Sequence, residues 1–218
     1  MSKARVVIHE VGPRDGLQME QTLVPFERKV AWILELARAG LDIVQVGSFV
    51  HPAKVPQMAD TDRLFPALRE GGLRRGTVLS ALVLNEKGLE RAFAAGADRV
   101  CMGVSASETH SRKNTGMGIA EASARIIAMA KQVLAAGLRV QVSVQSAFGC
   151  GYEGPVSEAR VIGLLRQYVD YGIKTVSLAG CDGLSFGFYD GATIERLRAI
   201  KAGMAEAEVA VGPPPRRQ

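Results

Sequence analysis

A short pattern recurs four times along the chain, and each copy consists of a helix end, a glycine and a strand. The copies are ARAGLDIVQV at 37–46, FAAGADRVCM at 93–102, LAAGLRVQVS at 134–143 and VDYGIKTVSL at 169–178. A glycine at a helix end suits the left-handed cap, and the apolar, β-branched run after it is typical of a parallel strand covered on both faces. This alternation predicts parallel strands joined by right-handed helical crossovers.

Six such helix and strand units can be placed along the chain. The expected strands lie near 5–10, 42–48, 77–84, 98–104, 138–146 and 174–179, and the expected helices cover Pro25–Ala39, Thr61–Glu70, Glu86–Ala95, Ile119–Ala136, Ser157–Tyr171 and Thr193–Ala205. An α/β chain of this kind forms either a doubly wound sheet or a barrel. No GxGxxG motif opens a helix, which disfavours the dinucleotide-binding form of the doubly wound sheet.

The number of units predicts an incomplete barrel. A complete TIM-type barrel has eight units and usually about 250 residues, whereas this chain has 218. The sixth helix is followed by EVAV, the start of a seventh strand, and then by GPPPRRQ, whose prolines lack the N–H groups that a strand needs. We therefore expect a single, incomplete parallel (β/α) barrel domain over residues 1–211, truncated at its C-terminal end, and an irregular tail over residues 212–218.

Composition and charge exclude several classes of protein. The net charge of +5 comes from scattered Lys and Arg residues without interleaved aromatic residues, so we expect no nucleic-acid partner. Apolar runs such as VLSALVL are far shorter than the roughly 18 residues of a membrane span, and the N-terminus lacks the apolar core of a signal peptide. We therefore expect a cytoplasmic protein without a membrane partner. The three cysteines show no CxxC spacing, which indicates neither a zinc site nor a disulfide framework.

The carboxyl ends of the strands are the places where both parallel architectures bind ligands. The first strand is followed directly by VGPRDGLQ, which as a tight turn would have Pro13 at its second position and Gly16 closing it. At a barrel mouth the carboxylate of Asp15 can ligate a hard divalent cation, and the guanidinium of Arg14 can stabilise an oxyanion. We expect both interpretations to hold, with the turn aiming these two charges into the mouth.

Three later strands also end in segments that can carry chemistry. His51 lies in the long loop after the second strand, and we expect it to form hydrogen bonds within the loop rather than to bind a ligand. Arg112 and Lys113 follow the fourth strand in a polar loop that either binds phosphate and carboxylate groups or is simply solvated. Cys150 follows the fifth strand between two glycines, as a reactive thiolate or as a small buried residue.

Four of these segments together resemble the 3-hydroxy-3-methylglutaryl-CoA lyase family, within a larger group of TIM-barrel metal-dependent lyases and acyl-transferring synthases. The segments are GPRDGLQ after the first strand, GSFVHPAKVPQMAD after the second, SASE with KN after the fourth and AFGCGYEG after the fifth. The resemblance covers about residues 5–206, which is nearly the whole chain.

The resemblance implies a retro-Claisen cleavage of a branched 3-hydroxyacyl-CoA to acetyl-CoA and acetoacetate, as in leucine catabolism. It implies a divalent cofactor, Mg²⁺ or Mn²⁺, with Asp15 as a metal ligand and with Arg14 as the catalytic arginine that stabilises the thioester enolate. The expected substrate-binding residues are Gln18, Gln45 and Ser146, and the expected partner is the acyl-CoA substrate.

The sequence also departs from the family pattern. Gln45 stands where the family usually has Glu, and an amide cannot take a proton at neutral pH. Gln141 stands where the fifth strand usually carries Arg, and Gly180 where an Asp is expected, with Asp182 two residues further on. The histidines of the chain are His9, His51 and His110. They cannot form the family's His-x-His pair, so we expect weak metal binding.

The leading hypothesis is therefore a hydroxymethylglutaryl-CoA lyase-like protein whose activity is impaired in this chain. The alternatives are a related lyase that acts on a different acyl-CoA, and a non-catalytic remnant that binds acyl-CoA or a partner subunit. An unclosed barrel would leave strand edges unpaired and apolar residues exposed on its inner face, so we also expect self-association or a homo-oligomer.

Overall fold

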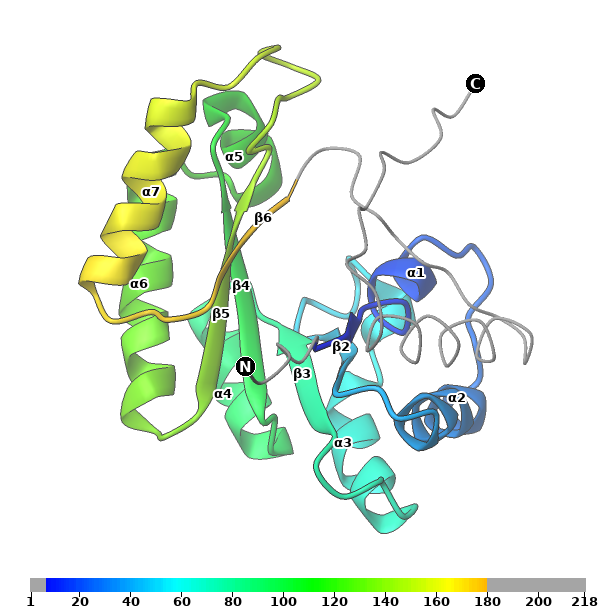
Figure 1. Cartoon of the computed structure of the whole chain (residues 1–218). Coiled ribbons are helices and arrows are strands. Elements are labelled where there is room, and N and C mark those ends of the chain that lie inside the picture. Colours follow the sequence, from blue (N-terminus) through cyan, green and yellow to red (C-terminus); the bar gives the residue numbers. More distant parts are fainter. Residues whose placement is uncertain (1–6, 180–218) are drawn as a thin grey trace, which may run out of the picture. The chain divides into compact units, whose positions relative to one another are not determined.

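The structure is a computed structural model that describes residues 7–179 of the chain (Figure 1). Its strands are β1 (His9–Glu10), β2 (Ile43–Ser48), β3 (Val78–Leu82), β4 (Arg99–Ser105), β5 (Arg139–Gln145) and β6 (Val176–Leu178). Its helices are α1 (Asp15–Gln18), α2 (Phe26–Arg38), the 3-10 turn η1 (Pro56–Met58), α3 (Thr61–Glu70), α4 (Glu86–Ala95), α5 (Glu108–Thr115), α6 (Ile119–Ala135) and α7 (Glu158–Asp170). The expected helix Thr193–Ala205, the seventh strand and the tail lie outside the described residues.

The strands follow one another in the sheet in the order of the chain, β1-β2-β3-β4-β5-β6. The pairs β1 with β2, β4 with β5, and β5 with β6 are parallel. In the longest of these ladders Arg99 pairs with Arg139 and Ser105 with Gln145. This sequential order without a reversal confirms the expected parallel α/β architecture of the TIM type and excludes a doubly wound sheet among the described strands.

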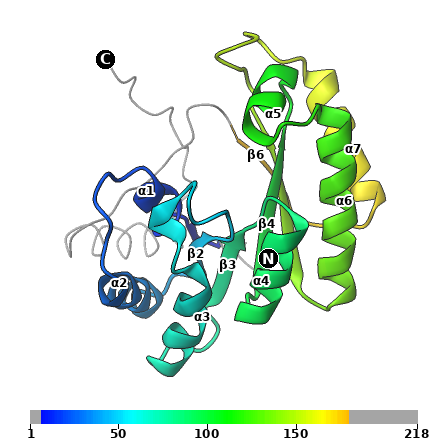
Figure 2. The same cartoon turned by 180° about the vertical axis from the view of Figure 1, so that it is seen from behind.

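Two compact units divide the described residues after Ser80, within β3. In the first unit α2 packs against α3, and both helices contact β2, as the view from behind shows (Figure 2). Apolar residues of these three elements form its core together with Phe49, which follows β2, and the rings of Phe49 and Phe65 stack with centroids 5.8 Å apart. The fully buried members include Ile33, Leu36, Val44, Leu64 and Leu68.

In the second unit α6 packs against β4 and β5, and α7 against β5 (Figure 1). The residues of β5 alternate in burial, so that its valines are buried while Gln141, Ser143 and Gln145 are only partly covered. This period of two places the apolar residues against the helices and leaves a polar face on the other side of the sheet. The buried apolar residues include Val100, Met102, Met129, Val133, Val142, Val144 and Tyr168.

The four glycines of the repeat all have the left-handed backbone conformation that their position predicted. Their φ angles are 91° at Gly40, 78° at Gly96, 73° at Gly137 and 81° at Gly172. A side chain is rarely tolerated at such angles, because its Cβ crowds the backbone. The repeat therefore fixes where each helix stops and where the next strand begins.

The structure adds helices that the sequence did not predict. The segment after β4, expected as a polar loop, contains α5, which begins where the Ser107 hydroxyl accepts a hydrogen bond from the His110 N–H at 3.1 Å. Its Glu108 and Arg112 form an ion pair one turn apart, at 2.7 Å. A helix that is polar all round has no apolar period, and α5 was missed for that reason.

The start of α4 provides a test of local helix capping. The Asn85 side-chain oxygen accepts a hydrogen bond from the Gly88 N–H at 2.8 Å. We expect Asn85→Ala to lower the free energy of unfolding by about 1 kcal/mol, because one N–H at the helix start loses its acceptor. Urea denaturation measures the change, with Asn85→Asp as the variant that keeps the cap and the exposed Asn114→Ala as control. An Asn85→Ala variant as stable as the unmodified chain would contradict this expectation.

Candidate functional site

The segment between β1 and α1 forms a turn that continues into a helix. The Val11 carbonyl accepts hydrogen bonds from the N–H of Arg14 at 3.0 Å and of Asp15 at 2.7 Å. The turn therefore starts at Val11, so Pro13 occupies its third position and Gly16 lies inside α1. The expectation that Pro13 would stand second and Gly16 would close the turn is wrong, because the backbone after Arg14 stays helical.

The side chain of Arg14 joins two of the other predicted site residues. Its Nε donates to the Gln45 Oε1 at 2.6 Å, and its Nη1 donates to the Asp15 Oδ1 at 2.5 Å. The Arg14 side chain is 18% exposed and the Asp15 side chain 43%, whereas Gln45 is buried in β2. These contacts hold a planar cation in a fixed orientation after the carboxyl end of β1 and against Gln45 of β2, beside a carboxylate that is accessible to a ligand.

The remaining predicted site residues lie at two other places. Gln18 is the last residue of α1 and is half-buried, and its N–H donates to the Arg14 carbonyl at 2.9 Å. Ser146 belongs to the second unit, where it directly follows β5 and is 2% exposed. The Ser105 hydroxyl donates to the Ser146 Oγ at 3.2 Å, and the Ser146 backbone has a φ angle of 53°. A non-glycine residue in this region of backbone space is under strain, which is frequent at functional positions.

Glu10 is a buried acid beneath the turn that the sequence analysis missed. It is 4% exposed, and its Oε1 accepts a hydrogen bond from the Gly12 N–H at 2.6 Å. Burial raises the pKa of this carboxyl from 4.5 to about 7, against the lowering effect of the Gly12 and Val11 backbone N–H groups. The signal was present in VVIHE, where an acid ends a strand that begins with an apolar run, directly before the charged turn.

The described residues supply one part of the divalent-metal site that the family resemblance implies. Asp15 offers a carboxylate oxygen, the type of ligand that Mg²⁺ and Mn²⁺ prefer. Across residues 7–179, however, no group of three or more His, Cys, Asp or Glu side chains is arranged to hold a metal ion. The donors that these residues bring together do not by themselves complete such a site.

The loop after β5 carries Cys150 in a buried position. Cys150 is 6% exposed and its Sγ accepts a hydrogen bond from the Tyr152 N–H at 3.4 Å. A hydrogen bond from the Ser107 side chain is the main cause that lowers the pKa of this thiol, with the backbone N–H groups of Tyr152 and Glu153 adding to it. The burial agrees with the small buried residue that was one of the two interpretations for this position.

The other residues singled out at the strand ends form local contacts. The His51 Nδ1 accepts a hydrogen bond from the Ala53 N–H at 3.2 Å, as expected for a loop residue. Arg112 is exposed on α5 beside Glu108, and the Lys113 Nζ lies 3.9 Å from the centre of the Tyr152 ring. Contacts of this kind agree with the solvated surface that was one of the two interpretations of this segment.

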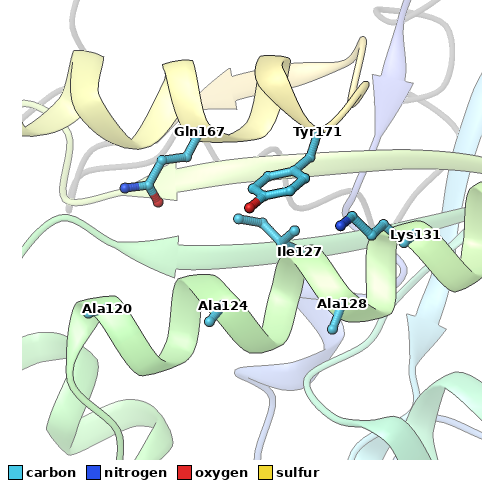
Figure 3. A pocket seen from close by; sticks show the side chains of 7 residues that line it. All are labelled: Ala120, Ala124, Ile127, Ala128, Lys131, Gln167 and Tyr171. Carbon is cyan, nitrogen blue, oxygen red and sulfur yellow. The ribbon is translucent and has the colours of Figure 1, made fainter.

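A groove lies between α6 and α7 on the helical side of the second unit (Figure 3). It has a volume of about 540 Å³ and is lined by Ala120, Ala124, Ile127, Ala128, Lys131, Gln167 and Tyr171. The Lys131 Nζ lies 4.1 Å from the centre of the Tyr171 ring. The lining of the groove contains no acid, histidine or cysteine, so we assign it no part in catalysis. No helix within the described residues is long and apolar enough to cross a membrane.

Comparison with known proteins identifies relatives along nearly the whole chain. Residues 5–210 match the HMGL-like protein family. A hydroxymethylglutaryl-CoA lyase of Bacillus subtilis is 36% identical over 174 residues, which are 80% of this chain and 57% of the relative. A 3-hydroxy-3-isohexenylglutaryl-CoA/hydroxy-methylglutaryl-CoA lyase of Pseudomonas aeruginosa is 33% identical over 208 residues, which are 95% of this chain and 67% of the relative.

Solved structures support the same relationship. The crystal structure of the B. subtilis HMG-CoA lyase matches with a TM-score of 0.78 and 33% identity, over 93% of this chain and 65% of that one. An HMG-CoA lyase from Acinetobacter baumannii, in complex with coenzyme A and 3-methylmalate, matches with a TM-score of 0.75 and 33% identity, over 84% of this chain and 58% of that one. The chain thus spans between about half and two thirds of the length of these relatives.

Proposed function

The chain belongs to the HMGL-like family, and from this premise we propose that it is a carbon–carbon lyase for a 3-hydroxyacyl-CoA. The proposed reaction is the retro-Claisen cleavage of hydroxymethylglutaryl-CoA to acetyl-CoA and acetoacetate. The observation that supports it most directly is the guanidinium of Arg14, which follows β1 and is held between Gln45 and Asp15.

Arg14 would stabilise the negative charge that develops on the thioester oxygen during this reaction. A base removes the proton of the 3-hydroxyl group, the C–O bond becomes a carbonyl, and the bond between C2 and C3 of the substrate breaks. The electron pair of that bond moves onto the thioester, whose enolate oxygen becomes negative until C2 is protonated to give acetyl-CoA. A cation that is already oriented stabilises this oxygen more in the transition state than in the substrate, which lowers the barrier.

The other predicted site residues would hold Arg14, the substrate or a metal ion, and they would not transfer protons. Gln45 is an amide, so it can hold Arg14 and accept or donate hydrogen bonds but cannot remove the hydroxyl proton. Gln18, the last residue of α1, is a proposed substrate-binding residue. Ser146 is also proposed as one, from the sequence alone. Asp15 is the proposed ligand of a divalent metal, which would supply a Lewis acid for the substrate oxygens.

A second candidate is a lyase of the same chemistry with a different acyl-CoA. The name of the P. aeruginosa relative includes a second substrate, 3-hydroxy-3-isohexenylglutaryl-CoA, and Gln45 and Gln141 depart from the family pattern here. Turnover of a panel of 3-hydroxyacyl-CoA thioesters separates these two candidates. Binding of acyl-CoA without turnover would instead support the non-catalytic alternative.

We also propose the substrate class, the location and the self-association of the protein. Coenzyme A is bound in the A. baumannii relative, which supports an acyl-CoA substrate for this chain. A cytoplasmic location, a part in leucine catabolism and self-association are proposed from the sequence alone. Light scattering over a range of concentrations tests the last, and a monodisperse monomer would contradict it.

The role of Arg14 can be tested by substitution. We expect Arg14→Ala to lower any lyase turnover by about 100-fold or more, because a donor aimed at a developing oxyanion contributes that much. A coupled assay for acetoacetate release from hydroxymethylglutaryl-CoA measures the rate, and Arg38→Ala, which removes an exposed arginine from the end of α2, is the matched control. Equal turnover of Arg14→Ala and the unmodified chain would remove Arg14 from the mechanism.

A further inference from the structure

The loop after β2 supplies three hydrogen-bond acceptors to a buried lysine of α2. Lys29 is 4% exposed, and its Nζ donates to the backbone oxygen of Gln57 at 2.6 Å and to the Asp60 carboxylate oxygens at 2.8 and 3.0 Å. These three acceptors match the three N–H donors of an ammonium group. The Asp60 side chain is 21% exposed, so the ion pair lies at the edge of the core.

The same loop reaches the segment that carries Asp15. The Gln57 Nε2 donates to the backbone oxygen of Glu20 at 2.7 Å, and the Glu20 N–H donates to the Leu17 carbonyl within α1 at 3.2 Å. The helices η1 and α1 are also in contact. A continuous path of hydrogen bonds therefore runs from Lys29 through Gln57 and Glu20 into α1.

The charge of Lys29 is not needed for packing. Lys29 lies four and seven residues before Ile33 and Leu36, on the stripe of α2 that faces the core, where an apolar side chain would fill the same space. Removing an ammonium group from water costs several kcal/mol, and an ion pair at such a place often contributes less to stability than apolar residues would. The ion pair is better explained by the position in which it holds the loop after β2.

The helix α1 depends on tertiary contacts for its orientation, of which its own buried Leu17 makes a part. It has only four residues, and so short a helix is not stable without tertiary contacts. We propose that Lys29 is a positioning residue that, through Gln57 and Asp60, holds the loop after β2 against α1 and so fixes how Arg14 and Asp15 are presented. Its catalytic consequence rests on the proposed lyase function, whereas its structural consequence does not.

The structural consequence is tested by hydrogen–deuterium exchange on the full chain. Lys29→Met keeps the length of the side chain but removes the donors, and we expect exchange in residues 15–20 to rise about tenfold while exchange in β2 stays unchanged. Lys29→Arg, which keeps the charge and donors, should restore much of the protection. Lys54→Met, on the exposed surface of the same loop, is the control and should change neither segment.

A second, milder variant provides the same test if Lys29→Met does not fold. Gln57→Ala removes the bond to Glu20 but keeps the backbone oxygen that Lys29 contacts, and it should also raise exchange in residues 15–20. Unchanged exchange there in both variants, or an equal rise throughout β2 and α2 in Gln57→Ala, would overturn the proposal.

The catalytic consequence has a separate readout. If the chain turns over an acyl-CoA, Lys29→Met should lower kcat about tenfold with little change in KM, because the displaced group acts in the transition state. A chain without turnover whose residues 15–20 lose protection as expected would contradict the lyase function and support the positioning role. An active chain whose protection and kcat are both unaffected would contradict the positioning role alone.

Discussion

Replacing Glu10 by glutamine is expected to stabilise the protein above neutral pH and to flatten the pH dependence of its stability. The carboxyl is buried, and its pKa in the folded state is about 7, compared with 4.5 for the exposed group. Between these two values the folded chain binds more protons than the unfolded chain, so stability falls as the pH rises through this window. The contribution of the protonated carboxyl to stability is fully present below about pH 4.5, and it is lost above about pH 7.

The size of the effect follows from the difference in pKa. A shift of one unit corresponds to about 1.4 kcal/mol, so the buried carboxyl should make the protein up to about 3 kcal/mol less stable at high pH than at low pH. Glu10→Gln keeps an oxygen for the Gly12 N–H but buries an amide NH₂ group, which costs about 1 kcal/mol. We therefore expect the variant to be about 2 kcal/mol more stable than the unmodified chain at about pH 8.

Urea denaturation of both chains at about pH 5 and about pH 8 measures these differences. Glu35→Gln, which neutralises an exposed acid on α2, is the matched control and should leave the pH dependence as it is. If Glu10→Gln and the unmodified chain lose the same stability between the two pH values, Glu10 is not the group that titrates.

The order of the strands and the ends of the helices could be predicted because local rules determine them. A glycine with positive φ ends the helices before β2, β4, β5 and β6, and the apolar runs that follow form those strands close to the expected bounds. The same rules located the turn at Arg14 and Asp15, because functional groups of parallel α/β proteins gather at strand ends. The contact between Arg14 and Gln45 follows from the parallel pairing of β1 with β2.

The side chains that support the turn could not be assigned by the same rules. Glu10 and Lys29 each stand in an otherwise apolar pattern, where a charged residue looks like an interruption until its partner is known. The partners come from elsewhere: Gly12 lies beyond the end of β1, and Asp60 is 31 residues away from Lys29. A charge inside an apolar stripe is thus the feature of such a sequence that most needs a structural explanation.

The metal-binding capacity of the Arg14 turn is expected to depend on residue 45. One carboxylate with waters holds Mn²⁺ only weakly, with a dissociation constant on the order of a millimolar, and the three histidines of this chain form no His-x-His pair. Asp15→Asn should abolish even this binding. Gln45→Glu places a second carboxylate against the guanidinium that Asp15 contacts, and we expect it to tighten Mn²⁺ binding about tenfold, which corresponds to about 1.4 kcal/mol.

Calorimetric titration with Mn²⁺ measures these affinities, and Gln132→Glu, on the exposed face of α6, controls for the added negative charge. Lyase turnover should follow these affinities from one variant to the next. Micromolar binding that survives Asp15→Asn would show that the metal is held elsewhere. Tight binding that Asp15→Asn abolishes would instead mean that Asp15 has partners outside residues 7–179, since one carboxylate cannot bind Mn²⁺ so strongly.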